Sequence, residues 1–180
     1  NCTNASQADR VAVLKEYADY QWAIASDFFI IFEHLGTNAE ETQWVNYRLD
    51  EGKGIMMWSK LTEKYNESTL GYHENKKSDF SWIDYKKRNW TVPANVAYME
   101  SHDEERLMYK NLEFGNSSGG YNVKDLATAL EREKIAGAFY FTVPGPRMIW
   151  QFGELGYDFS INRCTNGTIN NDCRLSNKPI

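Results

Sequence analysis

Acidic side chains follow two apolar segments of the chain, in positions suited to acid–base chemistry. Glu33 comes directly after the apolar run 28–32, and the pair His102-Asp103 follows the shorter run 96–99. A carboxyl at the end of a buried strand is partly desolvated, which favours its protonated form and suits it to donate a proton near neutral pH. An imidazole beside a carboxylate can hold ligand hydroxyls and stabilise positive charge. Glu33 and Asp103 are therefore candidate catalytic residues, and His102 is a candidate ligand-binding residue.

Other side chains near these segments are candidates for ligand binding. They are His34, Trp58, Arg106 and Glu154. The flat ring of Trp58, at the end of an apolar run, is suited to stack on the apolar face of a sugar. Each candidate also has a structural explanation, because acids at strand ends are common, residues 104–106 fit the charged first turn of a following helix, and Glu154 can cap its neighbours. The local sequence leaves both explanations open.

Apolar runs of strand length alternate with helical patterns along the chain. The runs are residues 28–32, 54–58, 96–99 and 148–152. Apolar spacing predicts helices over residues 6–22, with Ser6 as N-cap, over 40–49, and over 122–139 with an apolar face of Leu126, Leu130, Ile135 and Phe139. Unbroken apolar runs between helices are typical of buried parallel strands, and ligand chemistry gathers where such strands end. The sequence predicts an α/β fold of βαβ units with the candidate residues at strand ends.

Size and charge narrow the class of function. The chain has 180 residues, 42% of them hydrophobic and 14% aromatic, which is enough for one packed core, and we expect a single domain over 1–180. The formal charge of −5 leaves no basic stripe for a phosphate backbone, so no nucleic-acid partner is expected. No apolar run approaches the roughly 18 to 20 residues that span a bilayer, so no membrane span is expected. A neutral ligand such as a carbohydrate fits this composition better.

Cysteine and histidine patterns bear on metals and on the cellular compartment. Cys164 and Cys173 enclose a short polar loop, a spacing compatible with a local disulfide in an oxidising compartment. No Cys-x-x-Cys pair occurs and the three histidines lack metal-ligand spacing, so no metal site is expected. The opening residues lack the pattern of a signal peptide, so we expect any such peptide to have been removed or to lie upstream. The expected location is secreted or cell-envelope.

Three segments resemble motifs of the α-amylase family of glycoside hydrolases, in the order in which that family has them. Residues 30–34 (IIFEH) resemble the proton-donor motif that ends strand five of the family's barrel, and residues 98–103 (YMESHD) resemble the His-Asp motif that ends strand seven. Ser101 stands where the family has Asn. Residues 145–154 resemble the segment of strand eight, and 54–58 lie where strand six belongs. The resemblance covers almost the whole chain and is closest in style to bacterial secreted amylases.

The resemblance implies that the chain forms half of a TIM-type (β/α)8 barrel, about strands five to eight. It also implies the reaction and the role of each residue. Glu33 would protonate the leaving oxygen and later activate water, while His102 and Asp103 would bind the distorted sugar. The reaction would be the retaining, two-carboxylate hydrolysis of α-1,4-glucans such as starch and maltooligosaccharides. The family's nucleophilic Asp belongs to strand four, and no Arg-x-Asp strand precedes the opening helix. We therefore expect the isolated chain to be inactive.

Alternatives stay open on the sequence alone. The same residues serve α-glucan transferases and isomerases of the family, and a non-catalytic glycan-binding half-barrel would use Glu33 and Asp103 only as hydrogen-bonding groups. No cofactor is expected in this chain, and calcium is left open for a full-length parent, because the family's calcium ligands mostly lie in the other half. The open sheet edges of a half-barrel favour self-association.

Overall fold

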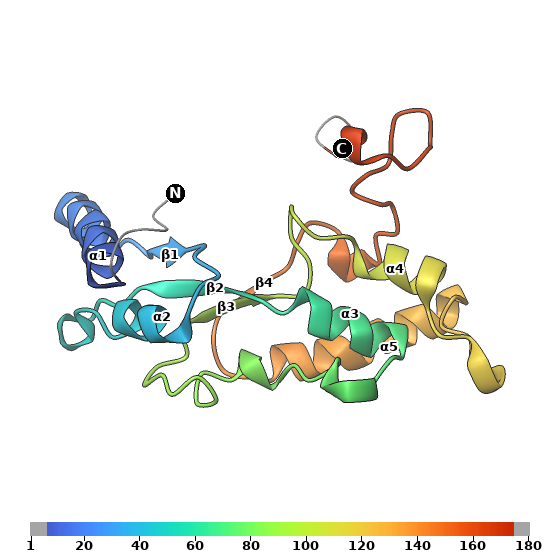
Figure 1. Cartoon of the computed structure of the whole chain (residues 1–180), viewed down its shortest axis with the longest axis horizontal. Helices are drawn as coiled ribbons and strands as arrows, with labels where there is room; N and C mark the ends of the chain where they lie inside the picture. The colour runs from blue at the N-terminus through green and yellow to red at the C-terminus, as the bar shows by residue number, and fades with distance from the viewer. Residues whose placement is uncertain (1–6, 175–180) are drawn as a thin grey trace. The chain divides into compact units, whose positions relative to one another are not determined.

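The computed structural model describes residues 7–174, so the predicted N-cap Ser6 and the third cysteine, Cys2, lie outside the described residues. Helices and strands alternate along most of the chain (Figure 1). The helices are α1 (Gln7–Ile24), α2 (Asn38–Val45), α3 (Thr62–Leu70), α4 (Leu107–Phe114) and α5 (Leu126–Phe141). The strands are β1 (Ile31–Phe32), β2 (Met56–Lys60), β3 (Asn95–Tyr98) and β4 (Arg147–Met148). Several short 3-10 turns connect them.

The described chain divides into two compact units. The first holds the residues up to Ser59 together with Ser81–Ala97 and Pro144–Arg147. The second holds Lys60–Phe80, Tyr98–Val143 and the residues from Met148 on. The expectation of one domain over 1–180 stays a prediction.

The strands form one parallel sheet in the order β1-β2-β3-β4. Ile31 pairs with Met56 and Phe32 with Met57, and the Met57 amide donates to the Ala94 carbonyl at 2.9 Å. Strand order that follows chain order, with helices between the strands, is the arrangement expected of successive βαβ units. The predicted α/β class with a parallel sheet is confirmed.

The predicted strands at both edges of the sheet are longer than the observed ones. β1 covers only the end of the run 28–32, because the Phe28 amide bonds back to Ala25 in the turn after α1, and Phe28 and Phe29 are exposed. β4 ends at Met148, because Phe152 has a φ of 66° and the backbone turns there. Apolar character alone does not make a strand, since a strand also needs a neighbouring ladder to pair with.

Helix starts differ from those predicted. α2 begins at Asn38, where the Thr37 side chain accepts from the Glu40 amide, and it ends before Arg48, whose φ is 57°. α5 begins at Leu126 rather than Asn122, because Asp125 is its N-cap. α4 begins at Leu107, so residues 104–106 precede that helix instead of forming its first turn.

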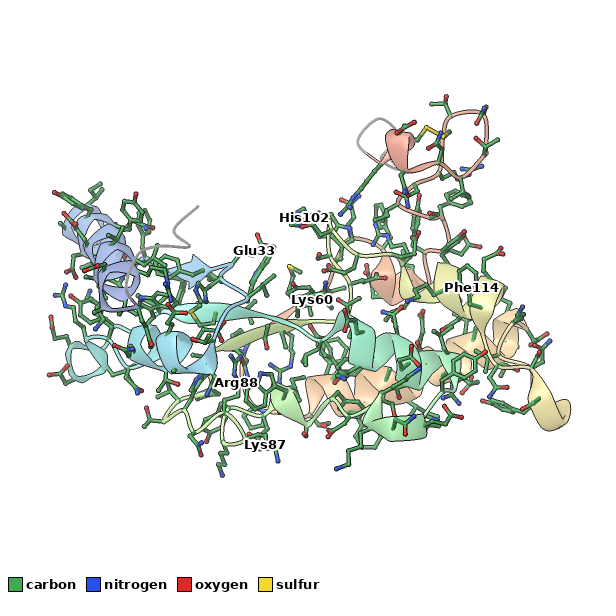
Figure 2. The ribbon with its side chains drawn as sticks, viewed as in Figure 1. Glu33, Lys60, Lys87, Arg88, His102 and Phe114 are labelled. Atoms are coloured by element: carbon green, nitrogen blue, oxygen red, sulfur yellow. A yellow bond between two sulfur atoms is a disulfide. The ribbon has the colours of Figure 1, made fainter. Side chains whose placement is uncertain are left out.

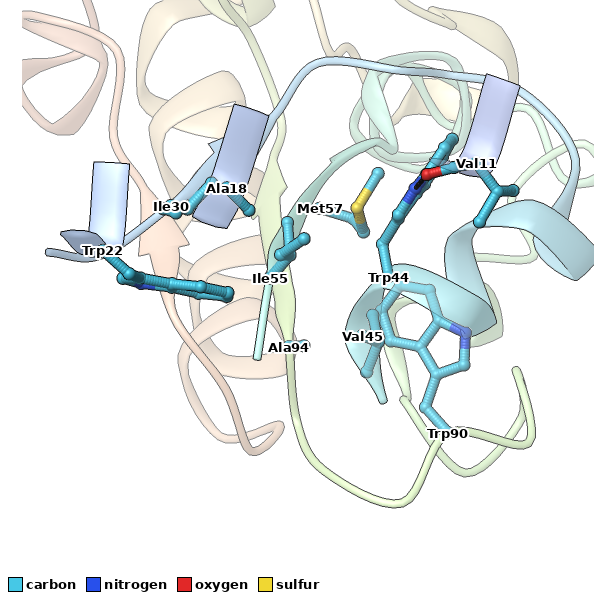
Figure 3. Packing of buried hydrophobic residues seen from close by; sticks show 10 residues of the cluster. All are labelled: Val11, Ala18, Trp22, Ile30, Trp44, Val45, Ile55, Met57, Trp90 and Ala94. Carbon is cyan, nitrogen blue, oxygen red and sulfur yellow. Dashed lines mark hydrogen bonds between the residues drawn. The ribbon is translucent and has the colours of Figure 1, made fainter. Parts of the chain in front are cut away.

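The core of the first unit lies between α1, α2 and the sheet (Figure 3). Val11, Ala18 and Trp22 form the buried face of α1, at the three- and four-residue spacing of a helix, whereas Tyr17 is exposed. Trp44 of α2 is fully buried, and its indole N–H donates to the Val11 carbonyl at 3.1 Å. This bond satisfies the one polar atom of a large apolar ring and fixes α1 on α2.

The second unit is built on α3, α4 and α5, which pack on one another (Figure 1). The buried face of α5 comprises Ala129, Ala136 and Tyr140, not the predicted residues Leu126, Leu130, Ile135 and Phe139, which are exposed. The small side chains of Ala129 and Ala136 let the neighbouring helices approach α5 closely, and the bulky side chains of α5 are exposed. Cys164 and Cys173 form the disulfide that their spacing allowed. Within residues 7–174, no helix has the length and apolar character to cross a membrane.

Candidate functional site

His102 and Asp103 lie together on the surface of the second unit, four and five residues after the end of β3. His102 Nε2 is 3.6 Å from Asp103 Oδ2, and both side chains are about half exposed. The Trp150 ring centroid is 6.0 Å from that of His102. An imidazole, a carboxylate and an indole face are the groups with which proteins bind a neutral polyol, the first two through hydroxyl hydrogen bonds and the third through an apolar ring face.

Arg174 contacts Asp103 from the far end of the described chain. Its guanidinium donates to Asp103 Oδ1 and to the Asp103 carbonyl, each at 2.6 Å. Arg174 directly follows Cys173, so the disulfide loop holds it in place. The candidate carboxylate therefore has a cationic partner within its own unit.

The turn before Asp103 is fixed by hydroxyl and carboxylate groups. The Ser101 hydroxyl accepts from the Asp103 amide at 3.1 Å and donates to the Glu104 carboxylate. Glu104 also pairs with Lys60, 3.2 Å away. Glu105 accepts from the Ser160 hydroxyl at 2.6 Å and the Ile161 amide at 2.9 Å. These bonds set the direction in which His102 and Asp103 leave the backbone.

Arg106, a predicted ligand-binding residue, is buried behind this turn. It donates to Glu100 Oε1 at 3.3 Å and to the Gln151 carbonyl at 3.0 Å, and its guanidinium lies over the Tyr157 ring at 5.0 Å. Glu100 also accepts from the Leu107 amide at 2.9 Å. Burial raises the pKa of Glu100 despite these partners. The contacts of Arg106 give it a structural role in joining residues 100 and 151.

Glu33 directly follows β1 in the first unit, as predicted (Figure 2). Its side chain is exposed, which contradicts the expectation that the strand end desolvates it. β1 is an edge strand of two residues, so it gives little cover to the residue that follows. Glu33 belongs to the first unit and Asp103 to the second, and their convergence on one ligand stays a prediction.

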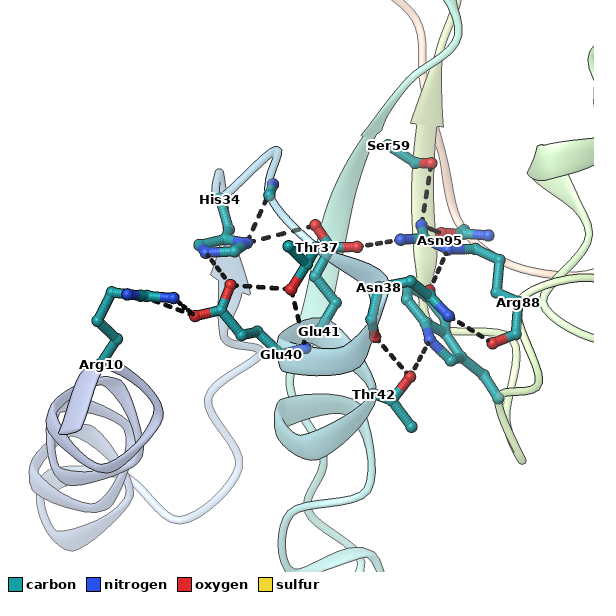
Figure 4. Close-up of polar contacts among 12 residues, drawn as sticks. Arg10, His34, Thr37, Asn38, Glu40, Glu41, Thr42, Ser59, Arg88 and Asn95 are labelled. Atoms are coloured by element: carbon teal, nitrogen blue, oxygen red, sulfur yellow. Dashed lines mark hydrogen bonds and ion pairs between the residues drawn. The ribbon is translucent and has the colours of Figure 1, made fainter. Parts of the chain in front are cut away.

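His34 lies among acids that the sequence did not single out (Figure 4). Its Nδ1 is 3.4 Å from Glu41 and its Nε2 is 3.7 Å from Glu40, while its ring packs edge-on against Trp44, with centroids 4.6 Å apart. The Gly36 amide donates to Nδ1 at 3.1 Å, so Nδ1 is an acceptor in the neutral ring and Nε2 then donates toward Glu40. These contacts turn both ring nitrogens toward the protein.

Two arginine–glutamate pairs hold this cluster, one partly buried and one fully buried. Glu40 accepts from Arg10 at 2.8 Å, and although burial opposes it, hydrogen bonds from Arg10 and Thr37 keep the pKa of Glu40 below its usual value. Arg88 pairs with Glu41 and donates to Asn95 Oδ1 at 2.6 Å (Figure 4). Burial lowers the pKa of Arg88, although Glu41 opposes that shift.

Sequence reasoning missed this network because its members are far apart along the chain. Residues 41 and 88 are separated by 47 positions, and residue 88 sits in a loop of lysines that predicts solvent exposure. One local signal was present: Glu40 and Glu41 precede Trp44 by four and three positions, which places these acids on the helical face that the tryptophan buries.

The remaining candidates are Trp58 of the first unit and Glu154 of the second. Trp58 is the third residue of β2 and is half-buried, so the expectation that it ends its strand is wrong. Glu154 is exposed and lines an apolar cavity of the second unit together with α5. Cys164 and Cys173 are joined to each other, so neither offers a thiolate to a metal.

Comparison with models of protein families finds none that matches the chain. Comparison with curated proteins likewise finds no match.

Proposed function

We propose that this chain is part of an α-glucan glycosidase of the α-amylase type, representing about strands five to eight of a (β/α)8 barrel. In this proposal Glu33 is the general acid and base, Asp103 and His102 bind the reacting sugar, and a strand outside this chain supplies the nucleophile. The isolated chain then binds maltooligosaccharides and does not cleave them.

One observation carries the proposal. The acid Glu33 directly follows β1, and the pair His102-Asp103 follows β3, in a sheet whose strand order is chain order. In (β/α)8 enzymes, catalytic groups come from the residues after different strands of one parallel sheet. The exposed arrangement of His102, Asp103 and the Trp150 ring supports a sugar-binding role for the second unit.

Complementation tests the catalytic part. An amino-terminal half-barrel with an Arg-x-Asp strand is co-expressed with this chain, and release of reducing ends from starch is measured. We expect activity with the wild-type chain and its loss with Glu33→Gln. Glu16→Gln on α1 is the control, because Glu16 is an exposed acid of the same unit. A folded complex that never hydrolyses starch, or one that tolerates Glu33→Gln, contradicts the proposal.

A non-catalytic glycan-binding protein is the second candidate, and the exposure of Glu33 favours it. Ligand-binding and catalytic clefts usually shield their acid from water, and the exposed side chain of Glu33 has no such cover within its own unit. Both candidates predict that maltoheptaose binds to the isolated chain and that Asp103→Asn weakens binding. They differ in the complementation assay, where only the glycosidase gives turnover that depends on Glu33.

A further inference from the structure

The second unit contains an apolar cavity of about 650 Å³ beside α5. Its walls include Leu130, Gly137 and Phe141 of α5 and, opposite them, Ile149 and Trp150. The volume lies within the range of about 300–1,000 Å³ that is usual for small-molecule sites. Leu130 is one of the exposed residues of α5 that the helical pattern wrongly placed in the core, and it forms part of this cavity wall.

The cavity lining includes four carboxyl groups, those of Glu100, Glu131, Glu133 and Glu154, and the two that are not exposed, Glu100 and Glu133, differ in their partners. Glu100 is held by Arg106 and by the Leu107 amide. Glu133 of α5 makes no hydrogen bond or ion pair with any residue between 7 and 174, and its Oε2 lies 3.9 Å from where a Cβ on Gly156 would stand. Glu154 has no such partner among these residues either, but it is exposed, so Glu133 is the unpaired acid that is partly buried in the apolar lining.

We propose that this cavity binds a monovalent organic cation, an ammonium group carried on an aromatic or branched apolar body. The ammonium would pair with Glu133, and the body would fill the space between Phe141 and Trp150, whose ring faces attract cations. An anion is disfavoured by Glu133 and Glu100. A hard metal ion is disfavoured because the walls are apolar and such ions need about six or more oxygen ligands. This site shares Trp150 with the proposed sugar site, but its charged group, Glu133, does not belong to that site, and the proposal does not rest on the proposed function.

The charged groups around Glu133 make ligand binding sensitive to pH. Burial raises the pKa of Glu133 to about 8, and the negative charge of Glu100 adds to the shift. Arg106 compensates Glu100, and the other charged groups of the described lining are Glu131 and Lys134, which pair with each other, and Glu154 at the exposed edge. A cation binds the ionised form of Glu133, so binding displaces its proton.

Calorimetry with benzyltrimethylammonium tests the proposal, because the charge of this probe is independent of pH. The size-matched neutral alcohol 2-methyl-1-phenylpropan-2-ol and the anion phenylacetate are the comparison ligands. At pH 9 we expect the cation to bind at least tenfold more tightly than either. Between pH 9 and pH 6 its affinity should fall, approaching about tenfold per unit below the pKa of Glu133.

Two variants and one control separate the charge from the cavity. Glu133→Gln should remove the preference for the cation and the pH dependence, whereas Glu113→Gln, at an exposed acid of α4 outside the cavity lining, should change neither. Gly137→Leu fills the cavity, since a Cβ there meets nothing closer than the Phe141 ring at 3.7 Å, and it should abolish binding.

Three outcomes overturn the proposal: no binding of the ammonium at either pH, equal affinity for the ammonium and the alcohol, or an unchanged preference in Glu133→Gln. Binding of an amphipathic leucine–lysine peptide but not of the ammonium also overturns it, and identifies the cavity as a groove for a helix.

Discussion

Arg174 holds Asp103 by two hydrogen bonds of 2.6 Å, one to the carboxylate and one to the main-chain carbonyl. The residue that the proposed function needs for a sugar hydroxyl is thus already paired with a cation. Sugar hydroxyls must either share Asp103 with Arg174 or displace the guanidinium. Because the disulfide ends one residue before Arg174, the loop 164–173 governs how readily that happens.

Removing the guanidinium should strengthen sugar binding. In Arg174→Ala the Asp103 carboxylate loses its guanidinium partner and keeps the neighbouring His102 ring, and a partly exposed ion pair of this kind is worth about 0.2–1 kcal/mol. We therefore expect the Kd for maltoheptaose to fall by up to about fivefold in titration calorimetry. Arg163→Ala is the control, because Arg163 lies in the same loop region over the Phe159 ring. A weaker affinity in Arg174→Ala would instead make Arg174 a sugar-binding residue.

Removing the disulfide should also strengthen sugar binding, because it frees the loop that holds Arg174 against Asp103. In the double variant Cys164→Ser/Cys173→Ser the loop is no longer closed, and Arg174 loses its anchor. Closing a loop of this length stabilises a fold by roughly 2–3 kcal/mol in the chain-entropy model. We expect the variant to be destabilised by up to that amount in urea and to show the affinity gain of Arg174→Ala. An unchanged affinity would mean that residues other than the disulfide position Arg174.

The buried pair Arg88–Glu41 should be costly to break from one side. Arg88→Met leaves the Glu41 carboxylate buried without its cation, which costs about 3–5 kcal/mol of unfolding free energy. Adding Glu41→Met should restore most of the loss, because two apolar side chains replace two charges. Urea unfolding followed by circular dichroism measures both. For comparison, Arg48→Ala removes exposed pairs with Glu51 and Asp19 and should lower the free energy of unfolding much less.

The edges of the sheet should mediate self-association of the chain. β1 and β4 are the terminal strands of the sheet order, and Ile31 of β1 is 44% exposed. An edge strand with an apolar side chain invites pairing with another copy, and a charge there opposes it. We expect the mass from light scattering to rise with protein concentration and to rise less in Ile31→Lys. Val13→Lys on α1, where Val13 is 48% exposed, should not have this effect.

The parallel sheet could be predicted because its signals are local. β3 lies within one residue of its predicted position, since all four of its residues are buried and the run is apolar throughout. β1 and β4 could not be bounded in this way. Their runs are equally apolar, but only the residues that pair with a neighbouring strand become part of the sheet. The sequence of one segment does not show which of its residues will find such a partner.

The candidate site could be predicted in its residue types and less well in their surroundings. His102 and Asp103 lie together because they are adjacent in sequence, and Glu33 follows a strand because the run before it is apolar. The exposure of Glu33 and the pairing of Asp103 with Arg174 depend on which distant segments lie nearby. The burial of Ala129 and Ala136 on α5 also depends on distant segments, because the neighbouring helices pack against the face of α5 that carries small residues.

Glu133 should make the stability of the chain fall as pH rises. Its pKa is raised from 4.5 to about 8, so between these values the native state keeps a proton that the unfolded chain has released. Its contribution is therefore complete below about pH 4.5 and is lost as pH rises to about 8. At full burial this pKa shift would lower the free energy of unfolding by roughly 5 kcal/mol over that pH range. Because Glu133 is partly exposed, we expect a loss of about 1–3 kcal/mol.

The difference between wild type and Glu133→Gln isolates this carboxyl from other titrating groups. Glu100, whose pKa is also raised, contributes in the same direction in both proteins, and Glu40 and Asp19, whose pKa values are lowered, act mainly below pH 4.5. Urea unfolding between pH 5 and pH 9 should show the variant gaining stability over wild type as pH rises. A constant difference across that range would mean that Glu133 is ionised in the native state at pH 5, and the cavity would then hold a permanent negative charge.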